Sequence, residues 1–266
     1  MNNDLRQKLI YLADKYETCS FTYEDPCQFL RWYDLSRPAE VETASFIAAM
    51  LAFGSRTQFI PKIQLILKMA DCSGGIVEWI KTDCYKKDFY YPEEPENLQK
   101  KFYRFYSYLD MQIFFEELGN ILRNSTLGDF FCKKWQEAKL SSDEKNPAVL
   151  SDIISAAFPK SKLVPKGKNS ASKRIWMFLR WMVRKNSPVD LGLWTWADPC
   201  ELLIPLDVHV MQEAASLGLI PENSTASRKT AVLLTKELNQ VFLGDPCRAD
   251  YALFGLGVDK NREASL

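Results

Sequence analysis

The sequence predicts an all-α protein. Apolar residues recur at intervals of three and four through most of the chain, whereas alternating runs bounded by turn residues, which would indicate strands, are scarce. Hydrophobic residues make up 47% of the 266 residues and aromatic residues 13%, which is enough for a packed core and argues against extensive disorder. This length fits one compact fold of two lobes.

The N-terminal third is expected to hold three helices. Residues 5–16 have the pattern of an amphipathic helix, and residues 40–51 that of a buried one. A polar corner at 54–58 then interrupts the pattern, which resumes over residues 59–70. The segment therefore predicts a helix, a polar corner and another helix.

The middle of the chain alternates loops and helices. Residues 83–96 combine prolines, tyrosines and charged residues, as in a loop. Helical spacing returns over 102–122 and 127–138, and a polar connector follows at 139–146. Residues 159–172 contain two prolines and one glycine, so we expect a turn-rich approach to the next helix.

The next predicted helix spans residues 174–185. A tryptophan-rich connector at 193–203 leads from it to Pro205, which suits a helix start, and Asp207 falls in the first turn of that helix. The apolar residues expected to face inward from the first of these helices are Ile175, Phe178, Leu179 and Met182. The tryptophans are expected mostly in the core, including Trp176, Trp181, Trp194 and Trp196.

The formal net charge is zero, yet basic residues are concentrated in one segment. Lys173, Arg180 and Arg184 lie at positions i, i+7 and i+11 of the predicted helix, which places them on one solvent-facing stripe. No Asp or Glu interrupts the basic residues of this segment, which are Lys160, Lys162, Lys166, Lys168, Lys173, Arg174, Arg180, Arg184 and Lys185. Such a segment favours a polyanionic partner.

Several classes of protein are excluded or disfavoured. The seven cysteines form no C-x-x-C pair, which is typical of free thiols in a reducing compartment. His209 is the only histidine, so histidine triads and multi-histidine metal sites cannot form. Residues 1–15 lack a signal or transit pattern and no run approaches a membrane span. We therefore expect a cytoplasmic protein with no membrane association and no metal.

Two segments resemble the catalytic region of the helix-hairpin-helix DNA glycosylase superfamily. The first is residues 170–173, Ser-Ala-Ser-Lys, before an apolar helix, and the second is residues 204–210, Ile-Pro-Leu-Asp-Val-His-Val. The resemblance implies that Lys173 and Asp207 are catalytic. An amine and a fixed carboxylate suit cleavage of a base from its sugar, because positive charge develops on the sugar ring and its anomeric carbon is attacked.

Two further stretches support the resemblance. Residues 46–58 are similar to the superfamily's early helix and polar corner, which implies DNA contacts at Arg56 and Gln58, and residues 251–257 resemble a late helix. The implied fold is two-lobed, with an active-site cleft between the lobes. Its lobes are a helical barrel, residues 40–187, which ends in the hairpin-like element, and a second helical lobe, residues 1–39 plus 188–266.

The chain departs from the superfamily at the hairpin. Two glycines usually precede the lysine there, whereas this chain has Asn169 and Ala171, so the grip of backbone N–H groups on a DNA phosphate is weakened unless Lys166 and Lys168 compensate. The long connection from Lys173 to Asp207 resembles that of archaeal-type 8-oxoguanine DNA glycosylases. Taken together, the matching segments resemble an uncharacterised bacterial family related to these enzymes. No cysteine follows Cys247, so we expect neither an iron–sulfur cluster nor another cofactor.

The resemblance predicts a base-excision DNA glycosylase that acts on double-stranded DNA containing a damaged base, as a monomer. A Schiff base at Lys173 would add abasic-site lyase activity. The expected DNA-binding residues are Arg56, Gln58, Lys166, Lys168, Arg174, Arg180 and Arg184.

Two other hypotheses remain open: a non-catalytic DNA-binding protein that retains the fold, and a helical protein whose basic stripe binds an acidic protein. Each residue also has a non-catalytic interpretation. Asp207 can be an ordinary residue at a helix N-terminus, Lys173 can be a solvated charge, and His209 can serve in packing or capping.

Overall fold

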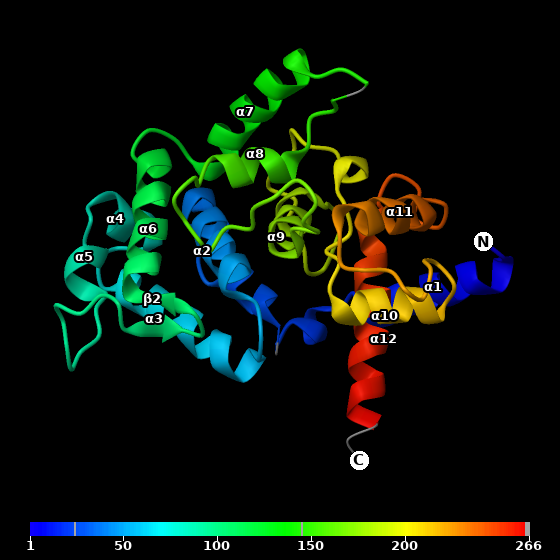
Figure 1. Cartoon of the computed structure of the whole chain (residues 1–266), viewed down its shortest axis with the longest axis horizontal. Coiled ribbons are helices and arrows are strands. Elements are labelled where there is room, and N and C mark those ends of the chain that lie inside the picture. The colour runs from blue at the N-terminus through cyan, green and yellow to red at the C-terminus, as the bar shows by residue number, and fades with distance from the viewer. Residues whose placement is uncertain (24, 145, 264–266) are drawn as a thin grey trace. The chain divides into compact units, whose positions relative to one another are not determined.

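The computed structural model describes residues 1–23, 25–144 and 146–263, and the chain is mainly helical, as predicted (Figure 1). It divides into two compact units, Met1–Tyr23 with Lys166–Leu266 and Glu24–Pro165. The lobes predicted from the sequence have later boundaries, so the helix that begins at Lys173 belongs here to the unit that contains the termini. Among the described residues, no helix is both long enough and apolar enough to cross a membrane.

The unit that contains the termini includes a helix that is buried over most of its length. This helix, α9 (Lys173–Val183), has every residue from Ile175 to Val183 buried. The other helices of the unit are α1 (Asn3–Tyr16), α10 (Val208–Ser216), α11 (Arg228–Asn239) and α12 (Ala249–Glu263). Short 3₁₀ helices lie between them at Cys19–Thr22, Pro199–Glu201 and Pro246–Arg248.

Helices α1 and α10 both pack against α12. A glycine allows the close approach of α1, because a Cβ atom on Gly255 would lie 2.2 Å from the ring of Tyr16. On α10, the ring of His209 lies 6.5 Å from that of Phe254, centroid to centroid. The structure thus places His209 in the packing between α10 and α12, the role expected for it.

The other unit begins with a 3₁₀ helix, Pro26–Arg31, that packs against α2 (Pro38–Leu51). Its further elements are α3 (Arg56–Asp71), α4 (Ile76–Lys81), α5 (Tyr85–Asp88), β1 (Lys101–Tyr103), β2 (Tyr106–Ser107), α6 (Tyr108–Leu122), α7 (Leu127–Ser141) and α8 (Leu150–Ala156). Helix α2 is buried from Glu40 to Leu51. Edge-to-face aromatic pairs around Trp79 and Phe115 fill the space between α4, α5 and α6.

The predicted start of one helix, the helix expected over residues 102–122, was wrong. Residues 102–107 form an antiparallel hairpin, β1 with β2, and only then does α6 begin. Ser107 caps α6 through a capping box with Asp110, and this local signal fixes the helix start. Helix α3 also begins earlier than predicted, at Arg56, inside the polar corner, and α5 lies within the predicted loop 83–96.

Candidate functional site

The structure brings Lys173 and Asp207 together. The Nζ atom of Lys173 lies 3.0 Å from Oδ2 of Asp207, although the two residues lie far apart in the sequence. The lysine side chain is 33% exposed and the aspartate side chain 15% exposed. The arrangement is a partly exposed lysine beside a largely buried aspartate.

The backbone at the start of α10 fixes the position of Asp207. Asp207 is the N-cap of this helix, and its Oδ1 atom accepts a hydrogen bond of 2.8 Å from the backbone N–H of Val210. One carboxylate oxygen therefore caps the helix while the other faces Lys173. The positive end of the helix dipole stabilises the ionised carboxylate. Asp207 can therefore cap the helix through Oδ1 and take a chemical role through Oδ2.

Lys173 is the first residue of α9 and follows a left-handed residue. Ser172 has φ 45°, and its side chain does not cap the helix. The left-handed conformation falls on Ser172 and on Gly167 (φ 99°), not on Asn169 or Ala171, the positions where the superfamily has glycines. The turn before the lysine is held instead by a hydrogen bond of 2.9 Å from the N–H of Arg228 to the carbonyl of Asn169.

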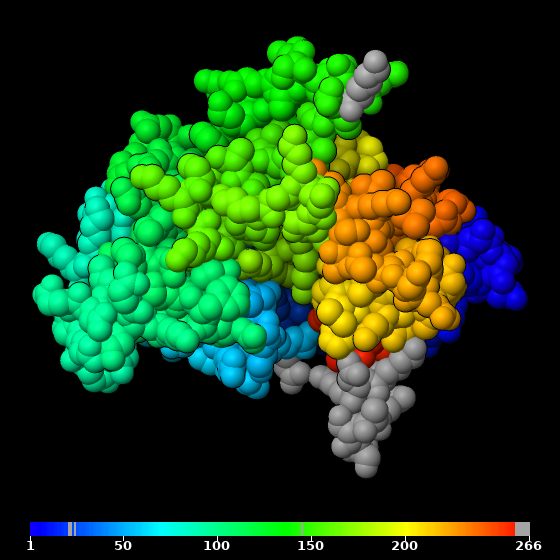
Figure 2. Space-filling view, viewed as in Figure 1, coloured from blue at the N-terminus to red at the C-terminus, as the bar shows by residue number. Residues whose placement is uncertain are grey.

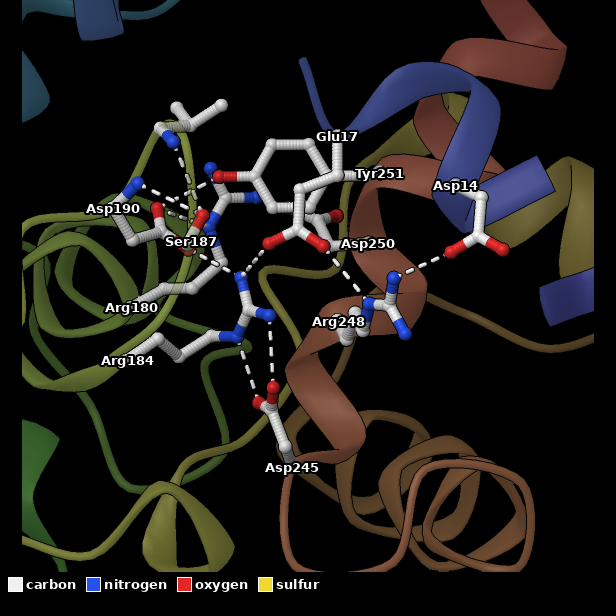
Figure 3. A network of polar contacts seen from close by, with 11 residues as sticks. Asp14, Glu17, Arg180, Arg184, Ser187, Asp190, Asp245, Arg248, Asp250 and Tyr251 are labelled. Atoms are coloured by element: carbon white, nitrogen blue, oxygen red, sulfur yellow. Dashed lines mark hydrogen bonds and ion pairs between the residues drawn. The ribbon is translucent and has the colours of Figure 1, made fainter. Parts of the chain in front are cut away.

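The expectation that Arg180 and Arg184 face solvent was wrong. Their side chains are 7% and 2% exposed and take part in a buried network of ion pairs (Figure 3). Arg184 donates to Asp245 through Nε and Nη2 at 2.7 and 2.8 Å, and to Glu17 and Asp190 through Nη1. Because every face of α9 is apolar or buried, no solvent-facing stripe exists, and the proposed DNA contacts of these two arginines are withdrawn.

The second arginine of the network joins it to the last helix. Arg180 pairs with Asp250 in the first turn of α12 and with Asp190, and its guanidinium lies 4.2 Å from the ring centroid of Tyr251. The hydroxyl of Tyr251 donates to Asp190 at 2.7 Å. Although burial lowers the pKa of the Arg184 guanidinium, its carboxylate partners raise it above its ordinary value. Both arginines thus serve as charged structural centres.

Asp250 links this network to the Lys173–Asp207 pair, and the sequence did not single it out. Burial raises the pKa of Asp250 to about 6, and the charge of Arg180 offsets this only in part. The charge of Asp207 raises this pKa further, and the charge of Lys173 lowers it. Asp250 therefore lies close enough to the pair for the charges of both residues to act on it. The burial of Arg180 and Arg184 was missed because their carboxylate partners come from distant segments of the chain, which the spacing of residues within one helix does not reveal.

The other predicted DNA-binding residues lie at the surface or near it. Lys166 and Lys168 are exposed on the segment before α9, and Arg174 is half-buried in the first turn of that helix. In the other unit, Gln58 is exposed, and Arg56 lies 3.4 Å from Asp25 with its side chain 31% exposed. The spatial relation of Arg56 and Gln58 to Lys173 stays a prediction.

The buried network borders a cavity of about 590 Å³ that does not include the lysine–aspartate pair. Its lining residues are Asp14, Glu17, Arg184, Lys185, Asn186, Pro188, Pro199, Asp245 and Arg248. The carboxylates of Asp14 and Glu17 pair with Arg248 at 2.6 and 2.9 Å, so the charged groups in the wall largely neutralise one another. In the part of the chain that the structure describes, no three His, Cys, Asp or Glu side chains are grouped so as to hold a metal ion.

Comparison with known proteins places the chain in a family without assigning it an activity. Searches of curated proteins and of solved structures each gave no match. A family model described as "Protein of unknown function (DUF2400)" matches residues 25–259, which include both Lys173 and Asp207. This match spans most of the chain, and the chain therefore belongs to the DUF2400 family.

Proposed function

We propose that this protein is a DNA glycosylase with abasic-site lyase activity, with Lys173 as the nucleophile and Asp207 as its acid–base partner. The observation that carries the proposal is the 3.0 Å separation between Nζ of Lys173 and Oδ2 of Asp207. The resemblance of both segments to the helix-hairpin-helix glycosylases supports the same roles. In this proposal the two helical units correspond to the two lobes of that fold.

The chemistry begins with a proton transfer. The ammonium of Lys173 cannot attack, so its proton passes to the carboxylate of Asp207, which frees the amine. A bond from Nζ to C1′ of the deoxyribose then forms while the glycosidic bond breaks, and the bonding electron pair leaves with the base. The base takes the proton from Asp207, whose restored carboxylate stabilises the positive charge on the sugar.

The lyase step follows from the same covalent intermediate. The C1′–O4′ bond breaks as a proton moves from the lysine nitrogen to O4′, which leaves an iminium ion between Lys173 and C1′. Loss of a proton from C2′ then expels the 3′-phosphate and cuts the strand. The base and the sugar must leave the duplex for this attack, so the substrate nucleotide is flipped out.

Five of the predicted DNA contacts are retained in the proposal. Lys166 and Lys168 precede α9 in the chain and Arg174 lies in its first turn, and cations and a helix N-terminus attract phosphate. Arg56 and Gln58 begin α3, at the corner that resembles the one that presses into the duplex in the superfamily. The partner is double-stranded DNA that carries a damaged base.

The test is base excision across a panel of duplexes that each carry one oxidised, deaminated or alkylated base or an abasic site. The proposal predicts release of at least one base, or strand cleavage at an abasic site, by the wild type. It predicts a loss of about a hundredfold or more in the Asp207→Asn variant. Salt-dependent DNA binding without excision on any substrate would contradict the enzymatic proposal and favour a non-catalytic DNA-binding protein. An absence of DNA binding would favour an acidic protein partner.

A further inference from the structure

The β1–β2 hairpin presents an exposed aromatic side chain at its tip. Arg104 adopts the left-handed conformation (φ 50°), and the next residue, Phe105, is 64% exposed. The Phe105 ring nevertheless has aromatic neighbours, with centroids 5.3 Å from that of Phe53 and 4.6 Å from that of Tyr106. One side of the ring is therefore supported while the rest stays open to solvent.

The hairpin is tied to its own unit on two sides. The hydroxyl of Tyr103 donates to the backbone carbonyl of Phe53, at the end of the segment that follows α2. The hydroxyl of Tyr106 donates to the carbonyl of Lys162 at 3.2 Å. These anchors lie on either side of Phe105 in the sequence. A ring held in this way loses little conformational freedom when it meets a ligand.

Arg104 adds an uncompensated positive charge beside this ring. Its guanidinium lies 5.8 Å from the Phe53 ring centroid and against Gly54, where an added Cβ atom would lie 2.5 Å from Nη1. Among the described residues, Arg104 has no carboxylate partner, and its side chain is exposed. We call Phe53, Gly54, Arg104 and Phe105 the Phe105 surface.

The two segments that meet at the Phe105 surface both lack acidic residues. No Asp or Glu occurs from Asn97 to Leu109, or from Thr43 to Ala70. In Figure 2 the blue-green atoms of the hairpin segment border the light-blue atoms of the corner between α2 and α3. The basic residues of these two segments therefore favour an anionic partner over a cationic or purely apolar one.

We propose that the Phe105 surface binds DNA by stacking Phe105 on an unpaired base while Arg104 meets a neighbouring phosphate. An exposed aromatic ring next to a cation is the combination that binds unpaired nucleotides, because every base has a face on which to stack and every nucleotide carries a phosphate. The inference deepens the proposed function, since removing a nucleotide from a duplex leaves an unpaired base opposite. Its site lies within one unit and does not involve Lys173 or Asp207.

The experiment measures binding by fluorescence anisotropy. The probe is a labelled duplex in which a tetrahydrofuran abasic analogue faces 2-aminopurine, whose own fluorescence reports stacking. Phe105→Ala should weaken binding about tenfold and remove the change in 2-aminopurine fluorescence, whereas Phe105→Trp should keep both. Arg104→Ala should lower the slope of log affinity against log salt by about one.

Two exposed residues of the same unit provide matched controls. Tyr90→Ala removes an aromatic ring that is 38% exposed, and Lys133→Ala removes an exposed charge on α7. Neither should change the affinity. Thermal unfolding of each variant shows whether it folds, and Phe105→Ala should melt close to the wild type because its ring is largely exposed.

Failure of the inference and failure of the proposed function give different results. Tight DNA binding that is unchanged in Phe105→Ala overturns the inference even if bases are excised. Binding that depends on Phe105 without any excision upholds the inference and contradicts the enzymatic proposal. If the wild type does not bind DNA, both proposals are overturned. The same holds if the wild type binds no DNA and instead forms a dimer that dissociates in the Phe105→Ala variant.

Discussion

The ammonium of Lys173 and the carboxylate of Asp207 lie 3.0 Å apart, and the same carboxylate caps helix α10 through its other oxygen. The cap fixes Asp207 on a rigid helix end, so the position of its Oδ2 atom relative to Lys173 depends on the packing of α10. Because one oxygen caps the helix and the other faces Lys173, substitutions of Asp207 can distinguish an effect on stability from an effect on catalysis.

Asp207→Asn and Asp207→Ala should differ in stability but not in activity. The asparagine oxygen can still accept from the N–H of Val210, whereas alanine removes the cap and should lower the free energy of unfolding by about 1 kcal/mol. Both variants lose the carboxylate and should lose excision. Urea unfolding and the excision assay measure the two effects. Equal stability of the two variants would show that the cap contributes nothing.

Arg184 should be required for folding stability. Its replacement by alanine leaves Glu17, Asp190 and Asp245 without their shared buried cation, so the free energy of unfolding should fall by roughly 3–5 kcal/mol. Lys185→Ala is the matched control, because this neighbour is exposed, and its effect should stay within about 0.5 kcal/mol. A stable Arg184→Ala protein that has lost only DNA affinity would contradict the structural role.

Asp250 should make stability depend on pH between about 4 and 6. Burial raises the pKa of Asp250 to about 6 in the folded protein, above its ordinary value of 3.8, and Arg180 offsets this only in part. The folded state therefore binds more protons across this range than the unfolded state, so this group's contribution to stability falls as the pH rises and is fully present only below about 4.

The check is the difference in unfolding free energy between the wild type and Asp250→Asn, measured at several pH values. The charged groups that act on Asp250 are Arg180, Asp190, Asp207 and Lys173, and all of them remain in the variant. The wild type should lose stability relative to the variant as the pH rises from about 4 to 6. A difference that is constant over this range, or that changes in the opposite sense, would refute the assignment.

Two glycines of α12 should respond differently to alanine. A Cβ atom on Gly255 would lie 2.2 Å from the ring of Tyr16, so Gly255→Ala should separate α1 from α12 and destabilise by about 1–3 kcal/mol. On Gly257 an added Cβ atom would lie 3.3 Å from the Cβ of His209 and 3.5 Å from the Cγ of Glu213, and the better helix propensity of alanine should offset these contacts. Thermal unfolding distinguishes the two, and equal melting temperatures would contradict the packing of α1 on α12.

Local periodicity predicted most of the helices because it depends on neighbouring residues alone. The 5–16 and 40–51 patterns correspond to α1 and α2, and Trp176, Trp181 and Trp194 lie in the core as expected. The hairpin at 101–107 was missed because the spacing of a short apolar run does not distinguish a strand from a helix. The capping box at Ser107 was the decisive signal for the start of α6.

The site was predicted in part for a similar reason. Lys173 and Asp207 are recognisable from short motifs, and the structure places them side by side. The burial of Arg180 and Arg184 depends on carboxylates distant in the sequence, namely Glu17, Asp245 and Asp250, and no helical pattern reveals such partners. Arginine is usually exposed, so spacing alone favoured the wrong face.

Borohydride trapping on abasic DNA tests the central claim most directly, because it reduces an iminium ion to a stable amine that joins protein and DNA. The wild type should form this covalent complex, and peptide mapping should place the DNA adduct on Lys173. Lys173→Ala should form none, while Lys185→Ala, which removes an exposed lysine of the same unit, should react like the wild type. No complex with the wild type, or one undiminished in Lys173→Ala, would contradict the role of Lys173 as the nucleophile.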